Sequence, residues 1–289
     1  MGPQCVNYVI WQFVLTIVIV IFFVPKLSSA KQSKLMGLSM NMIDRCWRPN
    51  SEWRRQRQQI ATCSIGYVGK MTNNIGYVGK MTNNIGKDLI QYEVTDPNDD
   101  PINPKLGTLR YGAYVIQGKT TNIFIHSIQI HHCKAQAPGM VMGSNRKVIH
   151  LGPVDGDAIR LVTASKIWID HNTLNDCEDG LLDVTRGSSN MTISNNWFRE
   201  QDKVMLLGHD DGYVRDKNTK VTIGYNHFGP NCNQRMPSMR PSLKSEANLV
   251  IAPKVGSKEI TWIQNGQTNG DKWEFHSVRD AFENGASFE

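Results

Sequence analysis

Residues 165–198 read SKIWIDHNTLNDCEDGLLDVTRGSSNMTISNNWF and contain one short pattern twice. The runs IWI (167–169) and MTI (191–193) are β-prone, and turn residues bound each of them. Ile169 and Ile193 stand 24 residues apart, and an Asn follows each of them by three residues. This spacing suits one solenoid coil of ~20–30 residues. The stretch therefore predicts stacked coils of short parallel strands.

Two further runs, IFI (123–125) and VTI (221–223), extend the pattern in both directions. When the four runs are aligned on their last Ile, the intervals are 44, 24 and 30 residues. The first interval holds either two coils or one long loop. We expect an all-β solenoid with a short N-terminal helix. A β-sandwich is the alternative, but its strands would recur every ~8–12 residues.

Asparagines recur in the same register as these runs. Asn172, Asn196 and Asn226 each follow the aligned Ile of their run by three residues. Asn favours turns in any fold. In stacked coils, however, Asn side chains at equivalent turns can form a ladder of hydrogen bonds that satisfies buried polar groups. We expect such a ladder here.

The N-terminus predicts export. Residues 14–24 read VLTIVIVIFFV, and Ser28 and Ala30 supply a small-x-small cleavage pattern. We expect residues 1–30 to be a signal peptide, and an uncleaved anchor helix is the alternative. Residues 31–64 form an N-terminal segment with an amphipathic helix over 51–63. Residues 65–289 form the β-helix domain. The perfect repeat of IGYVGKMTNN over 65–84 indicates a recent duplication or an error in the predicted coding sequence.

The net charge of the chain indicates which class of partner it binds. The net charge is +6 and the pI is near 9.0, which favours a polyanionic partner. No zinc-finger spacing or RNA-binding aromatic motif is present, so acidic polysaccharide is expected rather than nucleic acid.

Five cysteines follow the leader, so at least one is unpaired. Cys46 and Cys63 flank the expected helix and are the candidate disulfide. The pairing of Cys133, Cys177 and Cys232 stays open.

Four carboxylates are spaced by about one coil. Asp155 and Asp157 flank a glycine, and Asp179 and Asp183 follow in EDGLLD (178–183). Either motif alone is an ordinary turn sequence. Stacking of successive coils would bring the two pairs together, and clustered carboxylates need a cation. Calcium suits them because it takes 6–8 oxygen ligands in a flexible geometry. The four residues are therefore candidate calcium ligands.

Basic residues follow in the next coils, with Lys203 one coil before Arg235 and Arg240. Lys203 precedes the apolar run VMLL, and Arg235 and Arg240 stand five residues apart in RMPSMR. Any single Lys or Arg is usually only a surface charge. Guanidinium groups nevertheless match sugar carboxylates well, so these three are candidate substrate-binding or catalytic residues.

The chain resembles plant pectate lyases (polysaccharide lyase family 1), and within them the pollen- and style-type members. The matching motifs are DGDAIR (155–160), WIDHNTL (168–174), DGLLDVTRGS (179–188), TISNN (192–196), DKVMLLGHDD (202–211) and NCNQRMPSMR (231–240). Further similar stretches lie on both sides, so the resemblance covers most of the chain after its first 30 residues.

The resemblance implies a right-handed parallel β-helix and calcium-dependent β-elimination of (1→4)-α-D-galacturonan (homogalacturonan). We expect a secreted, monomeric enzyme of the cell wall that binds no membrane after signal cleavage. By motif position, Asp157, Asp179 and Asp183 are the primary calcium ligands, and Asp155 is a further ligand when substrate is bound. The resemblance also gives the basic residues their roles: Lys203 and Arg240 bind substrate carboxylates, and Arg235 removes the C5 proton. Asn190 lies in a glycosylation sequon, NMT, and is a candidate site.

The chain departs from the family at two internal points. Coils that the family normally has are missing near 119/120 and again near 240/241, next to Arg235. Losses that do not match coil boundaries would break the stacking register. Two alternatives to an active enzyme therefore stay open: a non-catalytic protein that binds pectin or calcium, and an inactive truncated product. A polygalacturonase is disfavoured, because hydrolysis does not call for the RMPSMR arm.

Overall fold

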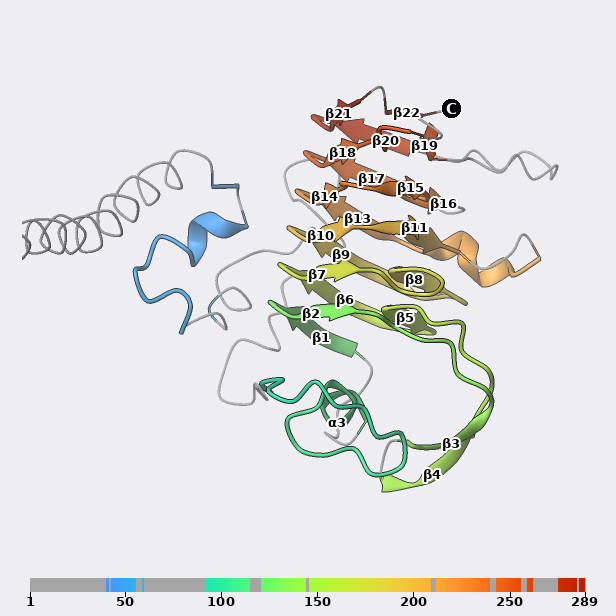
Figure 1. Cartoon of the computed structure of the whole chain (residues 1–289). Helices are drawn as coiled ribbons and strands as arrows, with labels where there is room; N and C mark the ends of the chain where they lie inside the picture. The colour runs from blue at the N-terminus through green and yellow to red at the C-terminus, as the bar shows by residue number, and fades with distance from the viewer. Residues whose placement is uncertain are drawn as a thin grey trace, which may run out of the picture. The chain divides into compact units, whose positions relative to one another are not determined.

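The computed structural model describes residues 40–41, 43–55, 59, 92–114, 121–143, 146–208, 212–239, 243–255, 259–261, 275–284 and 286–288. Residue contacts divide the chain into two units, 1–64 and 65–289. In the described part of the first unit, a 3-10 helix, η1 (Asp44–Cys46), is followed by turns. The second unit contains a stack of parallel strands (Figure 1).

Two six-stranded parallel sheets run along the stack. The first is made of β1 (Thr121–His126), β6 (Ser165–Asp170), β9 (Ser189–Ser194), β13 (Val221–Gly224), β17 (Leu243–Glu246) and β20 (Phe275–Val278). The second is made of β2 (Gln129–His131), β7 (Thr173–Asn175), β10 (Trp197–Arg199), β14 (His227–Phe228), β18 (Leu249–Ile251) and β21 (Ala281–Glu283). Each strand of the second sheet follows one of the first along the chain. The chain therefore winds through both sheets once per coil.

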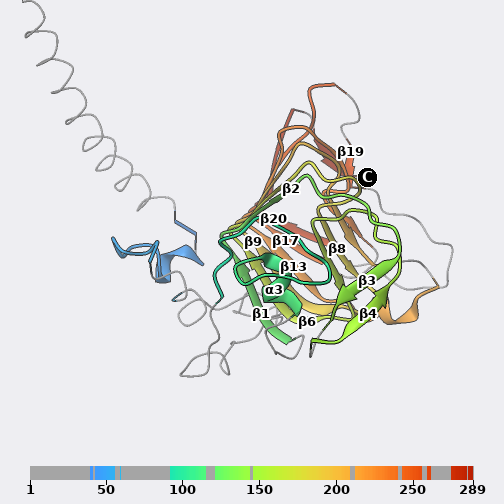
Figure 2. The same cartoon turned by 60° about the horizontal axis from the view of Figure 1, so that its bottom comes forward.

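Shorter parallel strands form a third face. The four-stranded sheet contains β5 (Ile159–Val162), β8 (Leu182–Thr185), β12 (Met205–Leu207) and β16 (Ser238–Met239). Two pairs complete it: β11 (Gln201–Lys203) with β15 (Cys232–Gln234), and β19 (Glu259–Thr261) with β22 (Ser287–Phe288). Seen toward one end of the stack, the coils superpose (Figure 2). The predicted parallel β-helix is confirmed.

The remaining elements lie at one end of this stack or project from it. The helix α3 (Leu109–Tyr114) lies next to the first coil, near β1 (Figures 1 and 2). The antiparallel hairpin of β3 (Gly139–Met142) and β4 (Val148–Leu151) projects beyond β5, at the same end of the stack as α3 (Figure 1). The 3-10 helix η4 (Val214–Asn218) lies between β12 and β13. None of the described helices is long and apolar enough to cross a membrane.

The register of the first sheet matches the sequence alignment. Ile125 pairs with Ile169, Ile169 with Ile193, and Ile193 with Ile223. Because β1 pairs directly with β6, the interval of 44 residues is one coil with a long loop. That loop carries the β3–β4 hairpin. The interior Ile side chains at 169, 193 and 223 are at most 1% exposed. Stacking them in line removes their apolar surface from water.

The expected Asn ladder is present and longer than the sequence suggested. Asn172 donates its backbone N–H and its side-chain Nδ2 to Asn196 Oδ1, both at 3.0 Å. Asn196 bonds Asn226 in the same way, and the ladder continues to Asn248 and Asp280. The residue before each Asn adopts a left-handed backbone, for example φ 53° at His171. This sharp bend turns the chain from the first sheet into the second.

The expectations for the N-terminal region and for the cysteines have mixed outcomes. The helix does not begin at Ser51: residues 51–55 form turns, because Trp53 N–H and Arg55 N–H donate to acceptors three residues earlier. Gln59 is helical, and the rest of 51–63, with Cys63, lies outside the described residues. The pairing left open is resolved, since Cys133 is bonded to Cys177 and Cys232 is free and buried. The signal peptide and the 65–84 repeat are also outside the described residues.

Candidate active site

Pairing of β5 with β8 brings the two acidic motifs together. Arg160 is the register partner of Asp183, and the N–H of Ala158 donates to Gly180 O at 3.1 Å. Asp157 and Asp179 lie just before these paired strands, one on each of two neighbouring coils. The one-coil spacing read from the sequence is therefore the spacing in the fold.

Three of the predicted ligands form one cluster. Asp155, Asp157 and Asp179 each offer a carboxylate oxygen, and the three oxygens lie within 4.8 Å of one another. Asp183 is not part of this triplet, although the sequence motif placed it among the primary ligands. Gly180 lies against both carboxylates: a Cβ there would stand 2.8 Å from Asp157 Oδ1 and 3.2 Å from Asp183 Oδ1. Asp183 is therefore a neighbour of the cluster, on the other side of this glycine.

The carboxylates repel one another and are partly cut off from water. Burial, together with the charges of Asp157, Asp179 and Asp155, raises the pKa of Asp183 to about 7, while the charge of Arg235 acts in the opposite direction. Burial likewise raises the pKa of Asp157 to about 6, against the hydrogen bond from Gly180 and with help from Asp155 and Asp179. A site that holds negative charge at this cost is suited to a cation.

The donor set fits a hard divalent cation. Asp157 Oδ2 is buried and has no hydrogen-bond partner among the described residues. An orphaned carboxylate oxygen is costly unless a cation or a proton satisfies it. The oxygens of the triplet and the neighbouring carboxylate of Asp183 match the all-oxygen coordination that calcium prefers. Asp155 also bonds Arg160, with Nη1 3.1 Å from Oδ1.

Two of the three basic candidates border this cluster. Lys203 ends β11, and its Nζ lies 2.5 Å from Asp179 Oδ1. Arg235 follows β15, whose Gln234 is the register partner of Lys203, so it lies one coil further along. Its charge acts to lower the pKa of Asp183, against burial and the neighbouring carboxylates. Arg240 lies outside the described residues.

A second group of potential ligands lies away from this site. His126, Asp170 and His171 lie at the ends of β1 and β6, and each offers an atom within 4.8 Å of the others. Asp170 is fully buried and accepts hydrogen bonds from Ser194 Oγ and Asn195 Nδ2. These contacts bind successive coils together, so we interpret the group as structural.

Sequence reasoning missed the residues that fix the site's backbone. The Cys133–Cys177 disulfide ties the loop before Asp179 to the preceding coil. Gln201, two residues before Lys203, hydrogen-bonds the same loop. Gly180 stood within a quoted motif, but only the packing shows what it does. No spacing rule indicates such contacts, because they depend on the path of irregular loops.

Comparison with known proteins agrees with the fold and with the motifs. A family profile described as pectate lyase matches residues 139–268. Pectate lyase 1 of Cryptomeria japonica is 36% identical over 322 aligned positions, which cover 86% of this chain and 83% of that protein. The chain belongs to the pectate lyase family. A probable pectate lyase of Arabidopsis thaliana is also 36% identical, over 86% of this chain and 77% of its own length.

A solved pectate lyase relative has the same architecture. The crystal structure of jun a 1, the major allergen from cedar pollen, matches with a TM-score of 0.68 and 34% identity over 86% of this chain and 90% of its own. The alignment with the Cryptomeria pectate lyase spans 322 positions, more than the 289 residues of this chain. That relative therefore has internal segments without a counterpart here. The predicted positions of the missing coils, near 119/120 and 240/241, stay predictions.

Proposed function

We propose that this pectate lyase family member cleaves homogalacturonan by calcium-dependent β-elimination and releases 4,5-unsaturated oligogalacturonides. The observation that carries the proposal is the convergence of the acidic triplet with Lys203 and the charge of Arg235 on one face of four successive coils. Carboxylates that could hold a cation lie there next to positively charged side chains that could bind a sugar carboxylate. That combination suits a polyanionic substrate.

Asp155, Asp157, Asp179 and Asp183 would hold the calcium ion. Bound calcium would draw charge from the uronate carboxylate and so make the neighbouring C5 proton more acidic. Lys203 would bind a substrate carboxylate, and Arg240 would bind one as the resemblance implies. Both would stabilise the negative charge that develops in the transition state.

Arg235 would accept the C5 proton. The electrons of the C5–H bond then form the C4–C5 double bond, the bond from C4 to the glycosidic oxygen breaks, and that oxygen takes a proton from solvent. Arginine keeps its proton in ordinary surroundings, and only a neutral guanidine can act as a base. We therefore expect the rate to increase toward alkaline pH.

The decisive experiment follows the absorbance of unsaturated product from polygalacturonate, with calcium or with a chelator. We expect activity with calcium, none with chelator, and loss of more than ~100-fold for Arg235→Ala. Arg186→Ala is the matched control, because Arg186 is exposed, lies outside the site and shares the left-handed backbone (φ 52° against 61° at Arg235). Calcium and pectate binding without product would instead identify a non-catalytic binding protein.

Secretion and glycosylation belong to the same proposal. Asn190 lies in β9 and is half-buried, while Thr192 of its sequon is fully buried. An enzyme that acts on cell-wall pectin as a monomer would be exported through the predicted signal peptide. Protein purified from the medium of a plant host should begin after Ala30. Treatment with an endoglycosidase would show by mass whether Asn190 carries a glycan.

A further inference from the structure

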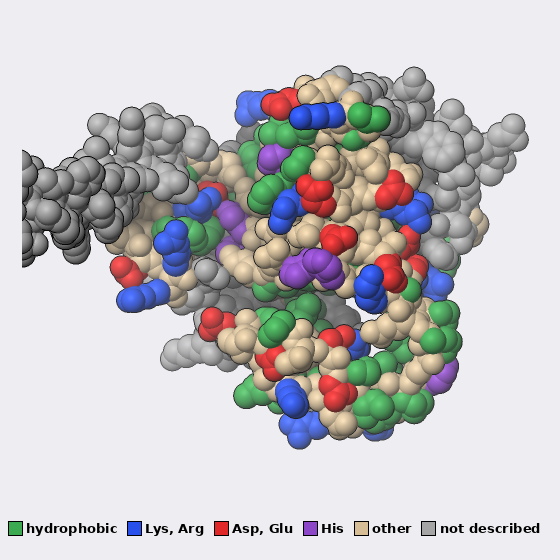
Figure 3. Space-filling view, in the orientation of Figure 1, with side chains coloured by type: hydrophobic (Ala, Val, Ile, Leu, Met, Phe, Trp, Pro, Cys, Tyr) green, Lys and Arg blue, Asp and Glu red, His purple; other side chains and the backbone are tan. Residues whose placement is uncertain are grey.

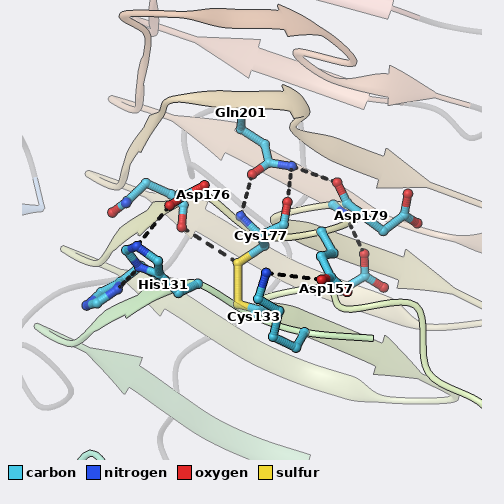
Figure 4. The surroundings of a disulfide bond; sticks show 12 residues. His131, Cys133, Asp157, Asp176, Cys177, Asp179 and Gln201 are labelled. Atoms are coloured by element: carbon cyan, nitrogen blue, oxygen red, sulfur yellow. Dashed lines mark hydrogen bonds and ion pairs between the residues drawn. A yellow bond between two sulfur atoms is a disulfide. The ribbon is translucent and has the colours of Figure 1, made fainter. Parts of the chain in front are cut away.

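Gln201 is a buried polar residue beside the site, with only 6% of its surface exposed. Its side-chain amide makes three hydrogen bonds, all to the loop between β7 and β8. Oε1 accepts the N–H of Cys177 at 2.8 Å. Nε2 donates to Cys177 O at 3.0 Å and to Asp179 O at 2.7 Å, as Figure 4 shows. One side chain therefore satisfies three backbone groups of the loop that carries a proposed calcium ligand.

Residues of strand β11 contact both the main chain and the side chain of Asp179. Side chains two residues apart on a strand point to the same side, so Gln201 and Lys203 both face the loop. Gln201 bonds the main-chain carbonyl of Asp179, and Lys203 bonds its carboxylate at 2.5 Å. Asp202 is exposed between them and accepts hydrogen bonds from Asn233 and Gln234 instead.

The loop is fixed on its other side by covalent and polar contacts. Cys177 is bonded to Cys133, and the N–H of Glu178 donates to Cys133 O at 3.1 Å. Glu178 Oε2 accepts the N–H of Ala135 at 2.6 Å. The preceding coil therefore anchors Cys177 and Glu178, while Asp179 has its backbone bond from Gln201. Of these contacts, the bond from Gln201 Nε2 is the one made to Asp179 itself.

We propose that Gln201 is a positioning residue that sets the backbone of Asp179 and so prepares its carboxylate for calcium; this rests on the proposed function. Ligands held in place before the ion arrives lose less conformational entropy on binding. Residues that orient metal ligands typically change metal affinity by about 10–100-fold when they are mutated.

The test compares Gln201→Met with Asp202→Asn. Methionine has a similar length but cannot make the three bonds, and Asp202→Asn alters the outward side chain on the same strand. Calcium binding is measured by calorimetry, and amide exchange of peptide 177–181 is measured in chelator. For Gln201→Met we expect at least about tenfold weaker calcium binding, a near-normal KM for polygalacturonate at saturating calcium, and faster exchange. For Asp202→Asn we expect no change in any of them.

An unchanged calcium affinity in folded Gln201→Met would overturn the proposal. So would an equal loss of activity at every calcium concentration with lower thermal stability, because that is a purely structural effect. If Gln201→Met does not fold, Gln201→Glu is used: it keeps the acceptor for Cys177 N–H and removes both donations. If the wild type binds no calcium, the proposed function fails, and the exchange rates alone then decide whether Gln201 holds the loop.

Discussion

The backbone N–H of Gly180 donates a hydrogen bond of 2.8 Å to Asp157 Oδ1 from the neighbouring coil. A Cβ at Gly180 would stand at the same distance from that oxygen, closer than any side-chain carbon normally approaches. Gly180→Ala therefore displaces the Asp157 carboxylate. We expect about 10–100-fold weaker calcium binding, measured by calorimetry, with a small change in thermal stability in chelator, because a carboxylate can move more easily than backbone.

Gly152→Ala is the control for this substitution. A Cβ at Gly152 would meet nothing within 4 Å, so calcium affinity and stability should both match the wild type. Normal calcium binding by Gly180→Ala would show that Asp157 is not a ligand.

The pH dependence of calcium binding follows from the raised pKa values. Asp157 and Asp183 titrate near 6 and near 7, so protons compete with calcium in that range. We expect calcium affinity to increase between pH 5 and about pH 8 and then to level off. Titrations at constant ionic strength would measure this, and a flat profile would contradict it.

Stability without calcium should change in the opposite direction. The native pKa of each carboxyl is above its ordinary value of 3.8, so the unfolded chain releases these protons first. The native state then binds more protons, and the free energy of unfolding decreases as pH increases from about 4 to about 7. Urea unfolding in chelator at several pH values would show this decrease, and saturating calcium should abolish it.

Asp183→Asn tests how much the buried charge of Asp183 lowers the stability of the fold when no calcium is bound. Asp183 is 8% exposed, and an amide of the same shape carries no charge. At pH 8 in chelator we expect the variant to melt at a higher temperature than the wild type, because an unpaired buried charge has been removed. At pH 5 the two should melt alike, since Asp183 is then protonated.

Asp155→Asn provides the comparison for this result. Asp155 is exposed, so the same charge change there should have little effect on stability at either pH. A destabilised Asp183→Asn at pH 8 would mean that ionised Asp183 makes favourable contacts, and the expected cost of its buried charge would then be wrong.

Much of the fold could be predicted because a solenoid repeats. Ile169 and Ile193 occupy the same place in successive coils, so the sequence interval is the coil length. The Asn ladder followed from the same register. Asn248 and Asp280 were not predicted, because Ser245 and Ser277 replace the Ile that marks the other coils. The choice between two coils and one loop after Ile125 also needed the strand pairing.

The residues of the site could be predicted from the sequence, but the contacts that hold them in position could not. Spacing brought Asp157 and Asp179 together, because stacking alone controls that proximity. The Cys133–Cys177 pair spans 44 residues and the hairpin loop, so no local rule indicates it. Gln201 bonds backbone groups of a loop, and its effect depends on a chain path that composition does not encode. The family resemblance supplied the roles of Lys203 and Arg235, and these roles await the experiments.

The Asn ladder offers a test of what holds the coils together. Asn196 is 1% exposed; its Nδ2 donates to Ile169 O and Asn226 Oδ1, and its Oδ1 accepts the N–H and Nδ2 of Asn172. Asn196→Ala leaves several of these groups buried without partners, at about 1–3 kcal/mol each. We expect the free energy of unfolding in urea to decrease by about 3 kcal/mol or more. Asn233→Ala is the control: Asn233 is exposed and makes one bond of 3.3 Å to Asp202, so its loss should cost less than about 0.5 kcal/mol. Equal effects of the two substitutions would mean that water replaces the ladder bonds, and that apolar stacking alone holds the coils.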